Sequence, residues 1–177
     1  LAEAKGLRTL VRAIPQILVA IPEARFVLVG PDFDFQAELM AMLDRQGTRA
    51  AVRITGPLSR IDLLACYRHA DLFVFPSRAE GFGIVLAEAM AAGLVPVAAE
   101  AMSIPEVIGN AGVLFPAGNA EALAKASIAL LLDDGRRKEL SEAARNRART
   151  FDWDKSAQTL YSVYEDLTRH RPARRAV

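Results

Sequence analysis

Short apolar runs alternate with segments whose apolar residues recur at helical spacing, and this alternation most constrains the fold. The short runs predict strands at residues 25–30, 52–56, 71–75, 95–99 and 112–115, because each is brief and continuously apolar. Between them, the spacing predicts helices over residues 7–18, 35–43, 61–69, 84–92 and 104–108. Strands separated by helices form right-handed βαβ units, so the strands are expected to be parallel.

Beyond residue 115 the pattern is helical only, with predicted helices at 120–132, 136–151 and 153–168. We therefore predict an α/β fold, a doubly wound Rossmann-like parallel sheet of about five or six strands with trailing C-terminal helices. The 177 residues, 52% of them hydrophobic, suffice for one domain spanning 1–177 with a full core. The chain starts without Met inside a helical pattern, so we expect a fragment of a longer protein.

Composition excludes several classes of function. A net charge of +1 argues against a nucleic-acid-binding protein, which is usually basic. One cysteine, Cys66, excludes an internal disulfide and fits a reducing compartment, and we expect its thiol in the core. No apolar run approaches the ~20 residues of a membrane span, so a cytoplasmic protein is predicted. The basic tail 169–177 is expected to be flexible; the alternative is peripheral contact with an anionic membrane surface.

One segment carries the clearest chemical signal. The strand 71–75 runs into Pro76-Ser77 and then into a glycine-bearing helix start, with Glu80 before that start and Glu88 after it. The free N–H groups and positive dipole end of a helix start suit phosphate. Ionised carboxylates only accept hydrogen bonds, so their natural partners are the hydroxyl groups of ribose or of a sugar. This motif predicts a site for a sugar nucleotide.

The same motif resembles the donor-binding half of retaining GT-B glycosyltransferases of group 1. The run from Pro76-Ser77 through Glu80-Gly81-Phe82-Gly83, Glu88-Ala89-Met90 and Gly93 to Pro96-Val97 carries the resemblance. It extends in order over nearly the whole chain, through Lys5-Gly6-Leu7, Val27 to Gly30, Gly56-Pro57-Leu58, Ile104 to Ile108, Gly112 to Phe115 and Asp152-Trp153.

The resemblance implies roles for particular residues. Glu80 would lie near the donor sugar, and Lys5 would neutralise the departing diphosphate; both are the expected catalytic residues. Glu88 would bind the nucleotide ribose. The other expected donor-binding residues are Phe82, Gly83 and Ile84, through their backbone N–H groups, and Gly30, Arg53 and Leu58. For Arg53, backbone contact with the base and a plain surface position remain equal alternatives.

Other side chains suggest chemistry that we do not expect. The Asp32-Phe33-Asp34 triplet could hold a divalent metal, but it leads into a helix, so we predict that Asp34 is an N-cap and that no metal is bound. No glycine fingerprint follows the first strand, so a nicotinamide cofactor is not expected. Trp153, Tyr161 and Tyr164 predict a packed helix face rather than a sugar platform. By the resemblance, this last helix would brace another domain.

These observations predict the donor-binding domain of a glycosyltransferase. The parent enzyme would transfer a sugar from a nucleoside-diphosphate sugar, with retention of configuration and without a cofactor. An acceptor sugar, lipid or small molecule would bind an N-terminal domain that this chain lacks, so the isolated chain would be inactive. The alternatives are a non-catalytic nucleotide-sugar-binding or partner-binding module, and a GT-B epimerase of nucleotide sugars.

Overall fold

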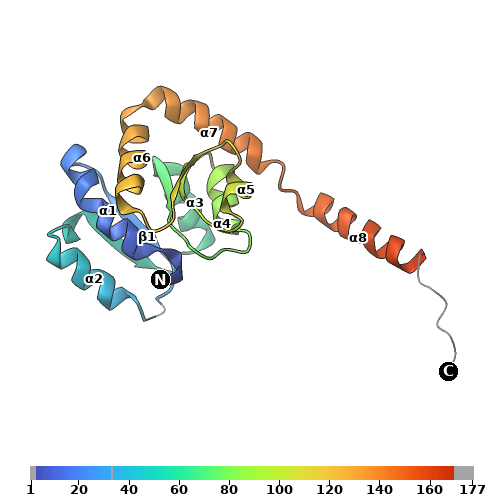
Figure 1. Cartoon of the computed structure of the whole chain (residues 1–177), viewed down its shortest axis with the longest axis horizontal. Helices are drawn as coiled ribbons and strands as arrows, with labels where there is room; N and C mark the ends of the chain where they lie inside the picture. The colour runs from blue at the N-terminus through green and yellow to red at the C-terminus, as the bar shows by residue number, and fades with distance from the viewer. Residues whose placement is uncertain (1–2, 33, 170–177) are drawn as a thin grey trace.

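The structure is a computed structural model that describes residues 3–32 and 34–169. The helices and strands follow one another in the predicted alternation (Figure 1). In order they are η1 (Glu3–Lys5), α1 (Leu7–Ala20), β1 (Phe26–Val29), α2 (Gln36–Arg45), η2 (Arg49–Ala51), β2 (Val52–Gly56), α3 (Arg60–His69), β3 (Leu72–Phe75), α4 (Ile84–Ala91), β4 (Val95–Glu100), α5 (Ile104–Ile108), β5 (Val113–Pro116), α6 (Ala120–Leu132), α7 (Asp134–Ala148) and α8 (Trp153–Arg169).

The strands are parallel, as predicted, but they pair in two ladders. β1 pairs with β2, and β3, β4 and β5 form a second ladder in that order. Within the described residues, β1 and β3 are not hydrogen-bonded to each other. The predicted parallel direction and strand positions are confirmed, and the described strands form two ladders instead of one continuous ladder.

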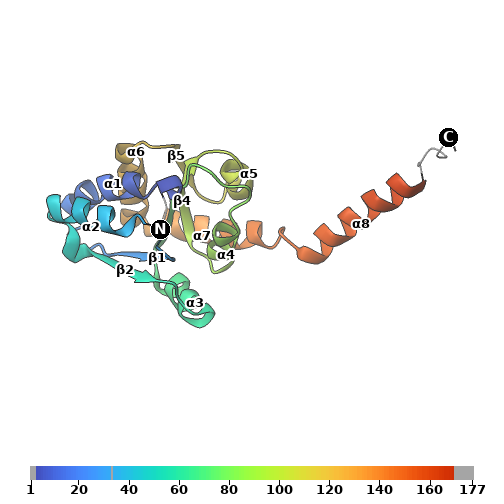
Figure 2. The ribbon, with the colours of Figure 1, turned by 90° about the horizontal axis from the view of Figure 1, so that it is seen from below.

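Helices cover both faces of the strands, which confirms the doubly wound α/β architecture (Figure 2). Alternate residues of β4 point to opposite faces, as strand geometry requires. Val95, Val97 and Ala99 pack with α1, α2 and α6, whereas Ala98 packs with α4, α5 and α7. The first of these cores also contains Leu28 of β1 and Val52 of β2. Apolar side chains, rather than backbone bonds, thus join the two ladders.

The last helix, α8, lies apart from this body and has no buried residue (Figure 1). Trp153 is 80% exposed and Tyr161 is 65% exposed. The prediction that these aromatic residues form a packed face is therefore wrong within the described chain. In the described part of the chain, no helix is long and apolar enough to cross a bilayer. The predicted flexible tail lies, after Arg169, outside the described residues.

Local details correct two further expectations. Asp34 does not cap α2; it has a positive φ of 59°. Phe35 is the residue before α2, and Asp32 Oδ1 accepts hydrogen bonds from the N–H groups of Phe35 at 3.0 Å and Gln36 at 2.9 Å. Cys66, expected in the core, is only half-buried.

Candidate functional site

The motif after β3 forms a tight turn that ends on a left-handed glycine. Pro76 and Ser77 are buried, and Gly83, with φ of 86°, precedes the first residue of α4. This φ favours glycine, because a Cβ is strained in the left-handed region. The N–H groups of Phe82, Gly83 and Ile84 make no hydrogen bond to any described residue. They are available to an anion, as the first N–H groups of a helix are.

Glu80 lies at the centre of a small polar cluster. Its Oε1 accepts a hydrogen bond from Lys5 Nζ at 2.5 Å and another from Ser77 Oγ at 2.9 Å. Its backbone carbonyl accepts one from Ser103 Oγ at 3.0 Å. The Glu80 side chain is only 12% exposed, against 51% for Lys5. The two residues expected to be catalytic are thus brought together, and both serines fix Glu80.

Lys5 reaches Glu80 because the N-terminal segment is packed against the motif loop. The Ala4 carbonyl accepts a hydrogen bond from the Arg78 N–H at 3.0 Å. Gly6 has φ of 68°, and a Cβ there would lie 2.7 Å from the carbonyl carbon of Pro76 and closer still to its oxygen. Glycine is therefore required on both steric grounds.

Glu88 has a partner that sequence reasoning missed. Arg60 Nη1 lies 2.6 Å from Glu88 Oε1, and the side chains are 67% and 23% exposed. Tyr67, on the same helix as Arg60, is buried. Burial raises the pKa of Tyr67 to about 12, the Glu88 carboxylate adds to the rise, and Arg60 opposes it. Glu88 therefore pairs with Arg60 of α3 and lies within electrostatic reach of Tyr67 on the same helix. The sequence did carry a signal for this pair, because Arg60 is a cation at the first position of a helix, where acidic residues are favoured.

The remaining expected donor-binding residues belong to the ladder of β1 and β2. The Gly30 N–H donates to the Gly56 carbonyl at 3.0 Å, which joins the carboxyl ends of both strands. Leu58 is half-buried in the loop that follows, two residues before Arg60. The Arg60–Glu88 pair therefore brings this loop to α4. Arg53 is exposed near the start of β2.

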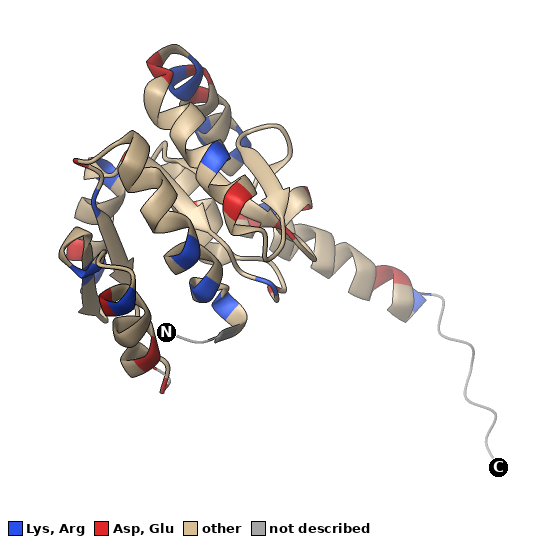
Figure 3. Cartoon of the chain, turned by 60° about the vertical axis from the view of Figure 1, so that its left-hand side comes forward, with Lys and Arg blue, Asp and Glu red and all other residues tan. Residues whose placement is uncertain are grey.

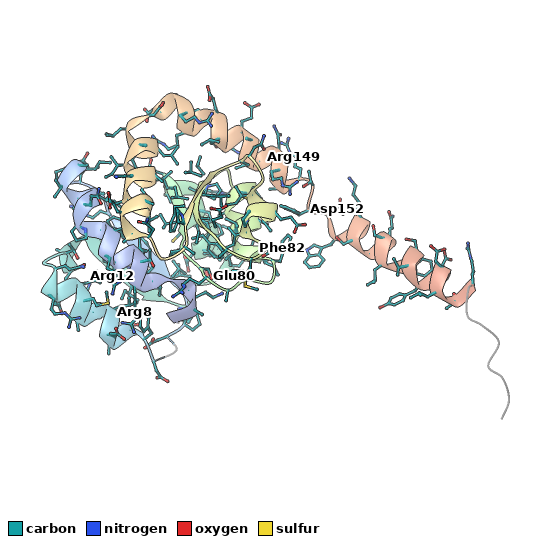
Figure 4. The ribbon with its side chains drawn as sticks, viewed as in Figure 1. Arg8, Arg12, Glu80, Phe82, Arg149 and Asp152 are labelled. Carbon is teal, nitrogen blue, oxygen red and sulfur yellow. The ribbon has the colours of Figure 1, made fainter. Side chains whose placement is uncertain are left out.

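Phe82 extends the site toward the end of the body. Its ring meets that of Phe151 edge to face, with centroids 5.2 Å apart. Figure 4 shows Glu80 and Phe82 between α1, which carries Arg8 and Arg12, and the linker that carries Asp152. The motif loop thus contacts both the start of α1 and the segment leading to α8.

Other surface features lie elsewhere. Hollows of about 340 Å³ and 220 Å³ are present, and neither is lined by Lys5, Glu80 or Glu88 or by residues 82–84. Among the described residues, no three His, Cys, Asp or Glu side chains gather as metal ligands would. Lysines and arginines are spread over the helices, with acidic residues among them (Figure 3).

Comparison with known proteins decides the family. Residues 1–147 match the family described as glycosyl transferases group 1. The chain belongs to this family. A D-inositol 3-phosphate glycosyltransferase of Xylanimonas cellulosilytica is 40% identical over 139 residues, which are 77% of this chain and 33% of the relative. A phosphatidyl-myo-inositol mannosyltransferase of Mycobacterium leprae is 34% identical over 166 residues, covering 92% of this chain and 43% of the relative.

Solved structures of other proteins share the fold. Alr3699/HepE of Anabaena, in complex with UDP and glucose, superposes with a TM-score of 0.82 at 28% identity, covering 94% of this chain and 46% of that one. This likeness confirms the α/β fold of the GT-B class. The group 1 chain spans less than half the length of the relatives named above.

Proposed function

We propose that this chain is the donor-binding half of a retaining GT-B glycosyltransferase and that it binds a nucleoside-diphosphate sugar. One observation carries the proposal: Glu80 and Glu88 flank the N–H groups at the start of α4, and Lys5 is hydrogen-bonded to Glu80. One short segment thus offers an anion site and carboxylates that accept hydrogen bonds from hydroxyl groups. Few ligands other than a nucleoside-diphosphate sugar need both.

Each part of the donor has a matching group. The diphosphate would bind the N–H groups of Phe82, Gly83 and Ile84. The Lys5 ammonium would turn from Glu80 to the oxygens of the diphosphate. Glu80 would then accept hydrogen bonds from the donor sugar. Glu88 would accept them from the ribose, since it lies on α4, roughly 6 Å along the axis from the helix start at 1.5 Å per residue. Positive charge from Lys5 and the helix start makes a metal unnecessary.

In the transfer step, the bond from the anomeric carbon to the diphosphate oxygen breaks, and a bond to an acceptor oxygen forms on the same face. The acceptor proton passes to the departing diphosphate. Lys5 and the α4 N–H groups would stabilise the negative charge that develops there, which is a large part of catalysis in such sites. The acceptor would be held by a further domain, so the isolated chain would not transfer sugar.

The exposed face of α8 fits a separation between this donor-binding chain and a further domain that holds the acceptor. Trp153, Leu160, Tyr164 and Leu167 recur at helical spacing, and each is more than half exposed. We propose that this face packs on the acceptor domain of the parent protein, because so large an apolar stripe is rarely left in water. We expect the parent enzyme in the cytoplasm, in contact with the membrane only at its surface.

Calorimetric titration tests the binding claim. UDP, GDP and ADP, each with and without an attached hexose, would be titrated into the wild type, Glu88→Gln and Glu106→Gln. Glu106 is an exposed carboxylate on α5 and serves as the control.

We expect one nucleotide series to bind, and Glu88→Gln to weaken it roughly tenfold or more, because hydrogen bonds to charged groups contribute about 1.5–3 kcal/mol. Glu106→Gln should bind as the wild type does. A folded wild type that binds none of the nucleotides would overturn the proposed function.

A further inference from the structure

We propose that Arg60 is a positioning residue that holds the Glu88 carboxylate in the orientation that receives the nucleotide ribose. The proposal rests on the proposed function, since Glu88 must bind ribose for its orientation to matter. It adds a residue from α3, and so from the β2 side of the site, to a motif otherwise built on β3 and α4.

The geometry leaves room for both partners. Arg60 Nη1 donates a hydrogen bond to Glu88 Oε1 at 2.6 Å. A carboxylate has about four lone-pair positions on its two oxygens, so Oε2 stays open to the ribose hydroxyls while Arg60 holds Oε1. Arg60 need not leave when the nucleotide arrives.

Arg60 contributes little that the fold itself requires. It is 67% exposed, and exposed ion pairs add only about 0–1 kcal/mol to stability. As the first residue of α3 it meets the positive end of the helix dipole, which disfavours a cation. Ser59 and Asp62 already fix this helix start, with Ser59 Oγ donating to Asp62 Oδ2 at 2.7 Å and accepting from the Asp62 N–H at 3.2 Å.

A second residue of α3, Tyr67, also lies in the surroundings of Glu88. It lies seven residues after Arg60 on α3, two turns along the same face. It is buried against Phe73, with ring centroids 5.9 Å apart, and is close enough to feel the Glu88 charge. Glu88, 23% exposed, is therefore held by Arg60 within electrostatic reach of the buried Tyr67. Without Arg60, we expect its carboxylate to turn toward water.

The test measures the Kd of the tightest-binding nucleoside diphosphate among UDP, GDP and ADP, and of its 2′,3′-dideoxy analogue. The proteins are the wild type, Arg60→Ala, Arg60→Lys, Glu88→Gln and the double variant with both Glu88→Gln and Arg60→Ala. Arg68→Ala, at an exposed position near the end of the same helix, is the matched control. Circular dichroism verifies that each variant is folded.

We expect Arg60→Ala to raise the Kd of the ribonucleotide about five- to tenfold, Arg60→Lys to recover part of the loss, and Arg68→Ala to change nothing. The dideoxy analogue, which lacks the hydroxyls, should bind the wild type and Arg60→Ala alike. In Glu88→Gln, the further change Arg60→Ala should have no effect.

Three results would overturn the positioning role while leaving the proposed function intact, provided that Glu88→Gln still weakens binding. The first is an unchanged Kd of the ribonucleotide in Arg60→Ala. The second is tighter binding in Arg60→Ala, which would make Arg60 a competitor of ribose. The third is a rise in the Kd of the dideoxy analogue as large as that of the ribonucleotide. A wild type that binds no nucleotide would overturn both proposals together.

Discussion

Replacing Gly6 with alanine should damage both the fold and the site, and the structure supplies a matched control. Gly6 and Gly47 both have φ of 68°. A Cβ on Gly6 would lie 2.7 Å from the Pro76 carbonyl carbon and 3.2 Å from its Cβ, whereas a Cβ on Gly47 would meet no heavy atom within 4 Å. The two substitutions share the cost of a left-handed alanine and differ in the steric clash.

The expected magnitudes follow from that difference. A left-handed alanine costs about 1 kcal/mol, which is the whole expected loss for Gly47→Ala. Overpacking against backbone adds about 1–3 kcal/mol, so Gly6→Ala should lose about 3 kcal/mol in total. For a chain of this size, the extra ~2 kcal/mol corresponds to a Tm lower by about 4–8 °C.

Thermal unfolding followed by circular dichroism would compare the two variants with the wild type. Equal Tm values for Gly6→Ala and Gly47→Ala would refute the packing argument, because the clash is then relieved without cost. The same proteins titrated with the preferred nucleotide should show weaker binding for Gly6→Ala alone, since Lys5 follows Gly6 away from Glu80.

Two further predictions concern ionisation and core packing. The pKa of Tyr67 is raised from 10.0 to about 12, so its neutral phenol stabilises the fold fully below pH 10, and this contribution is lost as pH rises through about 12. Urea unfolding between pH 9 and pH 11 should therefore show the wild type losing stability relative to Tyr67→Phe. Parallel curves of unfolding free energy against pH for the two proteins would contradict this. Ile14→Ala should lower the free energy of unfolding by about 2–5 kcal/mol, because Ile14 is fully buried, while Val19→Ala, at a residue 85% exposed, should change it little in the same urea experiment.

Local patterns predicted the elements well, because each depends on residues near one another in sequence. β2, α5 and α6 begin and end at the predicted residues. The start of α2 was misjudged because two aspartates lie close together. Only the turn conformation, with Asp34 at positive φ, selects Asp32 as the acceptor for the N–H groups at this helix start.

Features that depend on distant pairing could not be predicted from local patterns. Arg60 and Glu88 are 28 residues apart, and no helical or strand period relates them. The proximity of Lys5 to Glu80 followed only from family resemblance. The spacing of α8 predicted an apolar face, but a period does not say what that face packs against. The division of the strands into two ladders also left no trace in the periodicity.

The two ladders differ in what keeps them folded. A pair of strands is marginally stable alone, so the ladder of β1 and β2 depends on Leu28 and Val52, which anchor it in the shared core. Backbone amides on its unpaired side should exchange with solvent by local fluctuations of low free energy, well before global unfolding. The loops that carry Gly30 and Leu58 are therefore attached to the least cooperative part of the sheet, where they can adjust their conformation around a ligand while β4, paired on both sides, keeps its shape.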